Sequence, residues 1–225
     1  MTQSSSKNMD VSATVARVVA VAERRGPLAG RSTVVAFDGP AGAGKTTLAG
    51  ELADALSSEG GCDIPIVHMD DLYPGWDGLS PAVDLLVRQV LEPLAQGRPV
   101  SSPVYDWTRQ SFGDPRPLPA APWIVVEGVG CGSRSCRPYL SAVVWTDAPE
   151  ETRRTRALRR DGDAFRPYWY RWARQEKELF AREKTWEHAD LVLDTGGDSP
   201  DGPAGPTSTS AAHSTSRKDL HAQNG

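Results

Sequence analysis

The order of apolar and polar positions along this chain predicts short strands that alternate with longer helices. Apolar runs predict strands at 33–37, 64–69, 123–128, 142–147 and 191–194. Helices are predicted at 11–25, 47–56, 82–96 and 168–183, and in the Arg-rich stretch 149–160. Strands that alternate with helices form right-handed crossovers and a parallel sheet covered on both faces. The pattern therefore indicates an α/β, three-layer α/β/α fold around a mainly parallel sheet of about five strands.

The remaining stretches lack this periodicity. Residues 97–122 contain many prolines, and we expect a long irregular segment of the kind that is often functional. Residues 161–163, Asp-Gly-Asp, should break the helix that precedes them. Residues 1–10 are polar, and 196–225 are rich in Gly, Ser, Pro and Thr, so both are expected to be disordered. One domain, 11–195, remains, with its first helix packed on the core.

A glycine-rich motif lies between the first predicted strand and the helix after it. Residues 39–46 spell GPAGAGKT, a G-x-x-x-x-G-K-T pattern. Glycines let such a loop turn its backbone N–H groups toward a triphosphate, and the following helix adds the positive end of its dipole. Lys45 can reach the β- and γ-phosphates, and the Thr46 hydroxyl can ligate Mg²⁺. The alternative is a glycine-rich turn that happens to carry a lysine.

We therefore predict a P-loop NTPase-type domain that binds ATP and Mg²⁺. The residues expected to contact the nucleotide in this loop are Gly39, Ala41, Gly42, Ala43, Gly44, Lys45, Thr46 and Thr47.

Acidic residues stand at the ends of two other predicted strands. Asp70 and Asp71 follow one strand, and Glu127 ends another. In open α/β sheets, ligands bind at the carboxyl ends of the strands, where the phosphate loop also lies. Asp70 is a candidate general base that orients an acceptor hydroxyl, and Glu127 can hold Mg²⁺ directly or through water. A capping aspartate and a strand-end carboxylate satisfied by backbone donors are the structural alternatives.

Two further groups of side chains suit the same chemistry. Arg156, Arg159 and Arg160 can close over the phosphates as part of a small helical lid, although a charged helix is often only solvated. Tyr105 and Trp107 lie among prolines and can stack on a planar substrate, the alternative being core packing. His68 and His188 are expected to serve packing rather than catalysis.

Composition narrows the function classes. The chain of 225 residues has 25 basic and 29 acidic residues and a net charge of −4, which does not support a broad nucleic-acid surface. Its apolar runs fall short of a membrane span, and its first ten residues lack the layout of a signal peptide. Three cysteines, too few and too scattered for a disulfide framework or a zinc site, favour the cytoplasm.

These motifs resemble the uridine kinase-like family of P-loop kinases and, more distantly, the nicotinamide riboside kinases. The resemblance covers roughly 32–195 and rests on the ordered series GPAGAGKTTLA, MDDLY, PVYDW, VVEG, TDAPEETRRTRALRRD and HADLVLDT. It implies an ATP-dependent kinase that phosphorylates a small-molecule hydroxyl, with a nucleoside 5′-hydroxyl of the uridine or cytidine type as the leading acceptor. A riboside-like vitamin or a nucleoside monophosphate is the alternative acceptor. A non-catalytic nucleotide-binding regulator is the alternative class.

The resemblance also assigns roles to residues. Asp70 takes the place of the catalytic base, assisted by Lys45 and Arg160, and the metal-associated set is Thr46, Asp70 and Glu127. On the substrate side, the implied residues are Asp70, Tyr73, Asp77 at the ribose hydroxyls, Tyr105, Trp107 and Gln110. Uridine–cytidine kinases carry a His at the position of Gln110, so the part of the pocket that reads a pyrimidine differs here.

Overall fold

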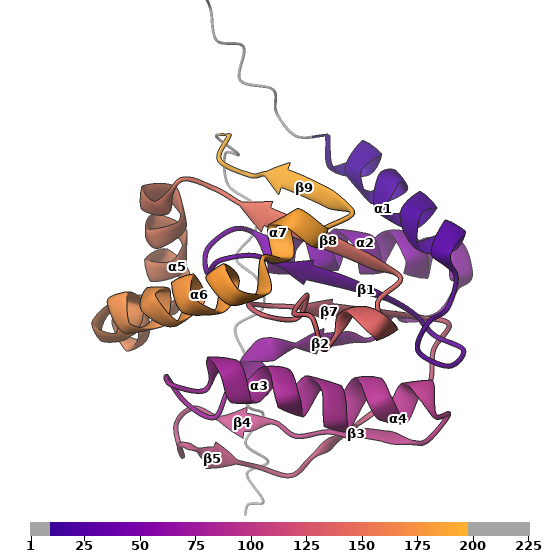
Figure 1. Cartoon of the computed structure of the whole chain (residues 1–225), viewed down its shortest axis with the longest axis horizontal. Helices are drawn as coiled ribbons and strands as arrows, with labels where there is room; N and C mark the ends of the chain where they lie inside the picture. Colours follow the sequence, from indigo (N-terminus) through magenta and orange to yellow (C-terminus); the bar gives the residue numbers. More distant parts are fainter. Residues whose placement is uncertain (1–9, 198–225) are drawn as a thin grey trace, which may run out of the picture.

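The computed structural model describes residues 10–197, and its centre is a parallel sheet with the strand order β2-β7-β1-β8-β9 (Figure 1). The five strands are β1 (Thr33–Asp38), β2 (Ile66–His68), β7 (Trp123–Glu127), β8 (Ala142–Asp147) and β9 (Leu191–Asp194). All five lie where the sequence predicts strands, and the predicted α/β fold is confirmed. Apart from Asp10, Gly196 and Gly197, the stretches predicted to be disordered lie outside the described residues.

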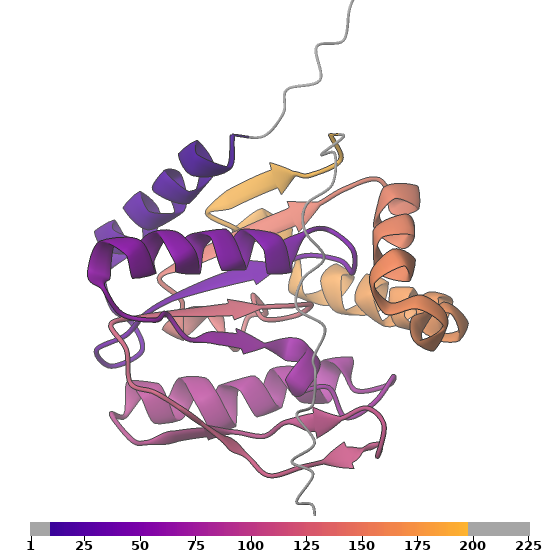
Figure 2. The same cartoon turned by 180° about the vertical axis from the view of Figure 1, so that it is seen from behind.

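Alternating side chains of β1, β7 and β8 pack against different helix layers, which makes the fold three-layered. In β1, Val34 and Ala36 belong to one core cluster, whereas Val35 and Phe37 belong to the other. The first cluster includes side chains of α3 (Leu79–Leu86), α4 (Glu92–Ala95) and α6 (Trp169–Glu183). The second includes side chains of α1 (Val11–Arg25) and α2 (Lys45–Gly60). Figure 2 shows α2 in front of the sheet, and Figure 1 shows α6 on the opposite side.

The helix predicted at 82–96 is interrupted. It consists of α3, a π-helical turn (Val87–Leu91) and α4. The N–H of Glu92 donates to Val87 O, five residues back, and the next residue, Pro93, has no N–H to donate. Proline thus explains why the helical ladder widens at this point.

The segment 97–122 is not irregular, as the sequence suggested, but forms two small antiparallel pairs. Strand β3 (Val100–Ser102) pairs with β6 (Arg116–Leu118), and β4 (Tyr105–Asp106) pairs with β5 (Ser111–Phe112). Strands of two or three residues are too short to show an alternating pattern, and this is why the sequence does not reveal them. The β4–β5 turn carries Trp107 and Gln110, and its N–H groups at Thr108 and Arg109 donate to the Asp106 carboxylate.

Two helices follow β8, in the region where the sequence predicts a small helical lid. Helix α5 (Glu150–Phe165) begins beside the end of β8, and α6 runs back over the sheet (Figure 1). Gly162 has a non-helical backbone (φ 58°, ψ −138°), so the predicted break lies within the assigned helix and turns the chain toward α6. A short helix, α7 (Thr185–His188), leads into β9. Within residues 10–197, none of the helices has the length and apolar character that crossing a bilayer requires.

Candidate active site

The phosphate loop connects β1 to α2 in a conformation that its glycines permit. A Cβ atom at Gly39 would lie 2.0 Å from Thr146 O, and one at Gly42 would lie 2.1 Å from Arg153 O, so neither position accepts a side chain. The first intrahelical bond of α2 runs from Leu48 N–H to Gly44 O. The N–H groups of residues 45–47 therefore lie at an open helix N-terminus, which is a natural anion site.

Lys45 and the two alanines of the motif lie inside the loop. The Lys45 side chain is buried, and its Nζ donates to Pro40 O at 2.8 Å. Ala41 and Ala43 are buried and shape the turn, whereas Thr46 and Thr47 are exposed on the first turn of α2. The contacts of these residues with phosphate stay a prediction.

Asp38, which the sequence reasoning did not single out, fixes the loop from behind. Its buried carboxylate accepts N–H bonds from Gly39, Gly130 and Gly132 at 2.7, 2.8 and 2.9 Å. Burial raises the pKa of Asp38, and the three amide donors oppose that shift. The carboxylate thus ties the phosphate loop to the loop after β7. The sequence signal that could have identified Asp38 is its position directly before the glycine-rich motif.

Thr46 and Glu127 meet at the end of the sheet. Thr46 Oγ1 donates to Glu127 Oε2 at 3.1 Å, and His68 Nδ1 lies 2.7 Å from Glu127 Oε1. Burial by itself raises the pKa of Glu127, but His68, Lys45 and the Thr46 hydroxyl together hold it below its ordinary value. His68, expected to serve packing, instead orients this carboxylate, and the bond to Glu127 raises the pKa of the imidazole.

This pair fits a Mg²⁺ site. An ionised carboxylate beside a hydroxyl offers the hard oxygen ligands that Mg²⁺ prefers, and the ion keeps several waters and takes its remaining ligands from phosphates. In residues 10–197 no cluster of three or more His, Cys, Asp or Glu side chains could hold a metal by itself. A metal here would therefore depend on the nucleotide as much as on the protein.

Asp70 lies at the end of β2, in a 3₁₀ turn (Met69–Asp71), and its side chain is exposed to the site. Desolvation by the protein around it, together with the negative charge of Glu127, raises the pKa of Asp70. The positive charges of Arg160 and Lys45 act in the opposite direction. The three residues predicted to be catalytic thus lie within electrostatic reach of one another. A raised pKa suits a general base.

The three lid arginines differ in their contacts. Arg160 forms a two-bond pair with Asp161, both bonds being 2.8 Å, and this pair raises the pKa of its guanidinium. Arg156 donates to Thr195 O at 2.9 Å, next to the loop. Arg159 is exposed on the same helix. Arg153, not predicted, contacts the loop through Ala41 O at 3.4 Å. The positive charge of Arg160 lowers the pKa of Asp70.

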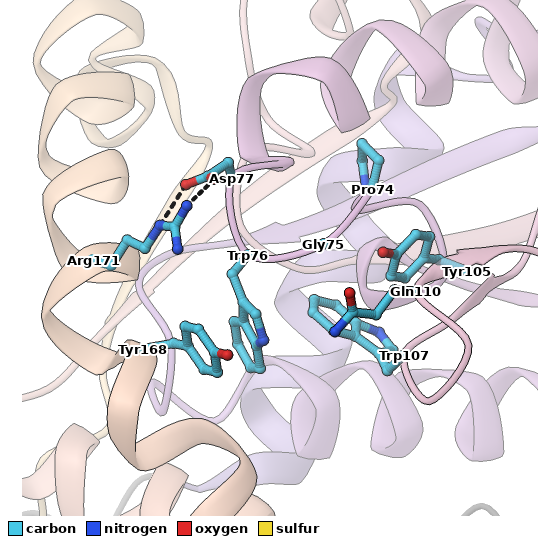
Figure 3. A pocket seen from close by; sticks show the side chains of 9 residues that line it. All are labelled: Pro74, Gly75, Trp76, Asp77, Tyr105, Trp107, Gln110, Tyr168 and Arg171. Atoms are coloured by element: carbon cyan, nitrogen blue, oxygen red, sulfur yellow. Dashed lines mark hydrogen bonds and ion pairs between the residues drawn. The ribbon is translucent and has the colours of Figure 1, made fainter.

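A cavity of about 280 Å³ opens between the loop at 74–77, the β4–β5 hairpin and the start of α6 (Figure 3). Four of the residues predicted for the acceptor line it: Asp77, Tyr105, Trp107 and Gln110. Trp107 donates from Nε1 to Asp70 O at 3.0 Å, which joins the cavity wall to the candidate base. An aromatic wall beside a carboxylate suits a planar acceptor with hydroxyl groups.

The other five lining residues, which include Trp76, Tyr168 and Arg171, were not predicted. Trp76 stacks on Tyr168 with ring centroids 4.5 Å apart and an interplanar angle of 9°, and it lies 4.7 Å from Trp107. Arg171 holds both carboxylate oxygens of Asp77 at the rim (Figure 3). Trp76 and Arg171 come from segments more than ninety positions apart, and no motif links them.

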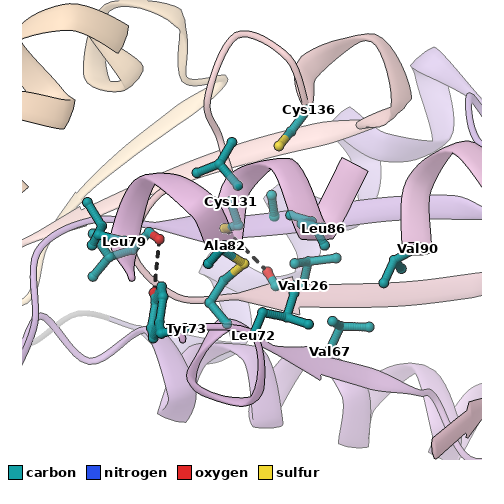
Figure 4. Close-up of a cluster of buried hydrophobic side chains, with 14 of the residues drawn as sticks. Val67, Leu72, Tyr73, Leu79, Ala82, Leu86, Val90, Val126, Cys131 and Cys136 are labelled. Carbon is teal, nitrogen blue, oxygen red and sulfur yellow. Dashed lines mark hydrogen bonds between the residues drawn. The ribbon is translucent and has the colours of Figure 1, made fainter. Parts of the chain in front are cut away.

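Tyr73 does not line this cavity, contrary to its predicted role. Its side chain is 1 % exposed, in a cluster of buried apolar groups (Figure 4), and its hydroxyl donates to Val129 O at 2.9 Å. Its ring meets Trp172 edge-on, with centroids 4.8 Å apart. Tyr73 therefore supports the site from within the core. The apolar neighbours that fold over it come from distant segments.

Comparison with known proteins adds structural but not sequence relatives. No family model matches the chain, and no curated protein reaches significant similarity. A candidate uridine kinase of known structure from Bacillus stearothermophilus is 25% identical, with a TM-score of 0.59 over 82% of this chain and 97% of that one. A candidate fructose transport system kinase from Silicibacter sp. TM1040 is 21% identical, with a TM-score of 0.55 over 83% of this chain and all (100%) of that one.

The sheet order, the phosphate loop and these neighbours define a protein with the P-loop kinase fold. A circularly permuted candidate P-loop kinase from Saccharomyces cerevisiae shares it at a TM-score of 0.51 and 12% identity, over 85% of this chain and 100% of that one. Within this class, the chain is similar in structure to the candidate uridine kinase, in agreement with the resemblance that its motifs carry.

Proposed function

We propose that this protein is an ATP-dependent kinase that transfers the γ-phosphate to a hydroxyl of a small molecule, and that the leading acceptor is a nucleoside 5′-hydroxyl. The observation that carries the proposal is the place of Asp70 between two sites. Its backbone oxygen accepts a hydrogen bond from the indole N–H of Trp107, which lines the acceptor cavity. The positive charges of Lys45 and Arg160, on the phosphate side, lower the pKa of its carboxyl group. A base at such a junction can meet a hydroxyl and a phosphate at once.

The side chains divide the work of phosphoryl transfer. The amides of residues 45–47 and the Lys45 ammonium bind the phosphates, and Arg160 stabilises charge on the transferring group. Asp70 orients the acceptor hydroxyl and accepts its proton as the new O–P bond forms, while the bond from the γ-phosphorus to the β,γ-bridging oxygen breaks and ADP leaves. Thr46 and Glu127 would hold Mg²⁺, with Asp70 nearby. When bound, the ion neutralises phosphate charge.

The cavity supports a nucleoside-like acceptor. Tyr105 and Trp107 meet edge-on, with centroids 5.3 Å apart, and provide aromatic surface for a planar base. Gln110 adds an amide that both donates and accepts, and Asp77 at the rim can accept ribose hydroxyl groups.

A second acceptor class has its own supporting observation. Arg171 lines the cavity and pairs with Asp77 in a two-bond arrangement, which is a geometry that guanidinium groups also use for phosphate. A nucleoside monophosphate, or another acceptor with an anionic group, would compete with Asp77 for this guanidinium.

A turnover assay tests the proposed function. Purified protein with Mg·ATP is incubated with a panel of nucleosides, ribosides and nucleoside monophosphates, and products are identified by mass spectrometry. We expect one class to be phosphorylated. Asp70→Asn should lower the rate by a factor of about 10²–10⁴ while nucleotide binding persists. Stoichiometric nucleotide binding with no phosphorylated product from any acceptor would instead favour a regulatory protein.

We place the proposed kinase activity in the cytoplasm, in keeping with the three free thiols of Cys62, Cys131 and Cys136.

A further inference from the structure

One face of α6 contacts both halves of the proposed site. Residues 171 and 175 are four positions apart, as are 172 and 176, and 172 and 175 are three apart, which places the four on the same side of the helix. Two of them hold the loop at 74–78: Arg171 binds Asp77, and Gln175 Nε2 donates to Trp76 O at 2.7 Å. Helix α6 is thus attached to the rim of the acceptor cavity.

The same face carries a buried carboxylate that reaches the phosphate loop. Glu176 is 4 % exposed, and its Oε1 accepts two bonds, from Ala41 N–H at 2.7 Å and from Trp172 Nε1 at 2.9 Å. The Trp172 ring in turn lies edge-on to Tyr73 and Trp76, at 4.8 and 6.3 Å between centroids. A continuous set of contacts therefore runs from the loop at 74–78, called the acceptor loop below, through α6 to the phosphate loop.

Glu176 and Lys45 hold the same peptide unit from opposite ends. The unit between Pro40 and Ala41 donates its N–H to Glu176, while its carbonyl accepts from Lys45 Nζ at 2.8 Å. This peptide directly precedes Gly42 and the rest of the loop, which leads to the open N–H groups of residues 45–47. Because Lys45 must turn toward the phosphates to bind them, the Glu176 bond remains to hold the plane of this peptide during the reaction.

We propose that Glu176 is a positioning residue that fixes the phosphate loop from the lid helix and makes its geometry depend on the acceptor loop. The proposal rests on the proposed function, since it requires that residues 39–47 bind a nucleotide. The two ends of the contact chain, Ala41 and Trp76, belong to different sites, so the structure assigns α6 the role of coupling them.

Binding and hydrogen exchange test the coupling, with Mg·ADP as the probe. Calorimetry gives the affinity, and hydrogen–deuterium exchange of residues 74–78 with and without Mg·ADP reports whether nucleotide binding is felt at the acceptor loop. We expect protection of 74–78 in the wild type. Glu176→Ala should weaken Mg·ADP binding about tenfold, the value of one lost charge-assisted hydrogen bond, and should remove the protection.

Two more conservative variants still test the coupling if Glu176→Ala folds poorly. Glu176→Gln retains an oxygen acceptor for Ala41 N–H, so a smaller loss of affinity is expected. Trp172→Phe keeps an aromatic ring but removes the N–H bonded to Glu176. It should keep nucleotide affinity within about twofold and lose the protection at 74–78. Glu178→Gln, at an exposed position of the same helix, should match the wild type in both measurements.

The outcomes separate the two proposals. Wild-type protein that does not bind Mg·ADP would overturn the proposed function, and the coupling with it. Normal binding in the wild type, with affinity and protection unchanged in Glu176→Gln and Trp172→Phe, would overturn the coupling alone. Reduced affinity in Glu176→Ala with intact protection of 74–78 would also reject it, because it would assign Glu176 to the stability of the loop only.

Discussion

Trp107 donates its indole N–H to the backbone oxygen of Asp70 at 3.0 Å. The first residue lies in a four-residue turn between β4 and β5, and the second lies in the 3₁₀ turn directly after β2 of the central sheet. A hydrogen bond between them ties the wall of the acceptor cavity to the segment that carries the candidate base. The position of the base therefore depends on a small hairpin that is not part of the main sheet.

Trp107→Phe should show this dependence. The variant keeps an aromatic surface and loses the single N–H donor, so kcat/KM for the acceptor should fall about tenfold, while the affinity for Mg·ADP stays within about twofold. Steady-state kinetics with the acceptor found in the turnover assay, and calorimetry with the nucleotide, give the two values. Trp186→Phe removes the same group from a partly exposed ring on α7 and serves as the control. Unchanged acceptor kinetics in Trp107→Phe would contradict the structural link.

Glu127→Gln should raise the Mg²⁺ requirement. The amide cannot offer an anionic ligand, so the Mg²⁺ concentration at half-maximal activity should increase at least about tenfold. Nucleotide binding without metal should change little, because the amides of the phosphate loop are untouched. His68→Asn, which alters only the partner of Glu127, should produce a smaller increase. Activity is measured as a function of Mg²⁺ concentration for the wild type, Glu127→Gln and His68→Asn. Identical curves would show that Glu127 does not bind the metal.

Arg160→Gln should slow the transfer step. The charge of Arg160 reaches Asp70, and its loss should lower kcat at least about 100-fold with little change in KM for the acceptor. Arg154→Gln provides the matched control on the same helix, since its guanidinium lies over the Tyr170 ring, 5.5 Å from the ring centroid. Equal effects of the two substitutions would point to the stability of the lid rather than to charge at the reacting phosphate.

Glu176 should make stability depend on pH. Burial raises the pKa of this carboxyl above its ordinary value of 4.5, so the folded chain retains a proton at pH values at which the unfolded chain has released it. The free energy of unfolding contributed by this group therefore falls as the pH rises from the ordinary value through the raised pKa. Glu176→Gln cannot take up this proton. The difference in unfolding free energy, wild type minus variant, should decrease as the pH rises above the ordinary value of 4.5 in urea titrations. A constant difference would show that Glu176 does not titrate in this range.

The sequence by itself determined the sheet, the phosphate loop and the acids at the strand ends. Long apolar runs such as 142–147 must be buried on both faces, and the spacing in GPAGAGKT reflects contacts within one short loop. Such features depend on residues that are close together in the sequence, so the sequence alone can predict them. For that reason the sequence could locate Lys45, Thr46, Glu127 and Asp70 at one edge of the sheet, while their roles stay predictions.

The tertiary structure decided which distant side chains meet. The burial of Tyr73, the bond from Glu176 to Ala41 and the pairing of Arg171 with Asp77 join segments separated by tens of residues. Nothing in the local sequence distinguishes Glu176 from the exposed Glu178 two positions later. Which of the two is buried depends on the rotation of α6 against the sheet, and packing of the whole helix face fixes that rotation.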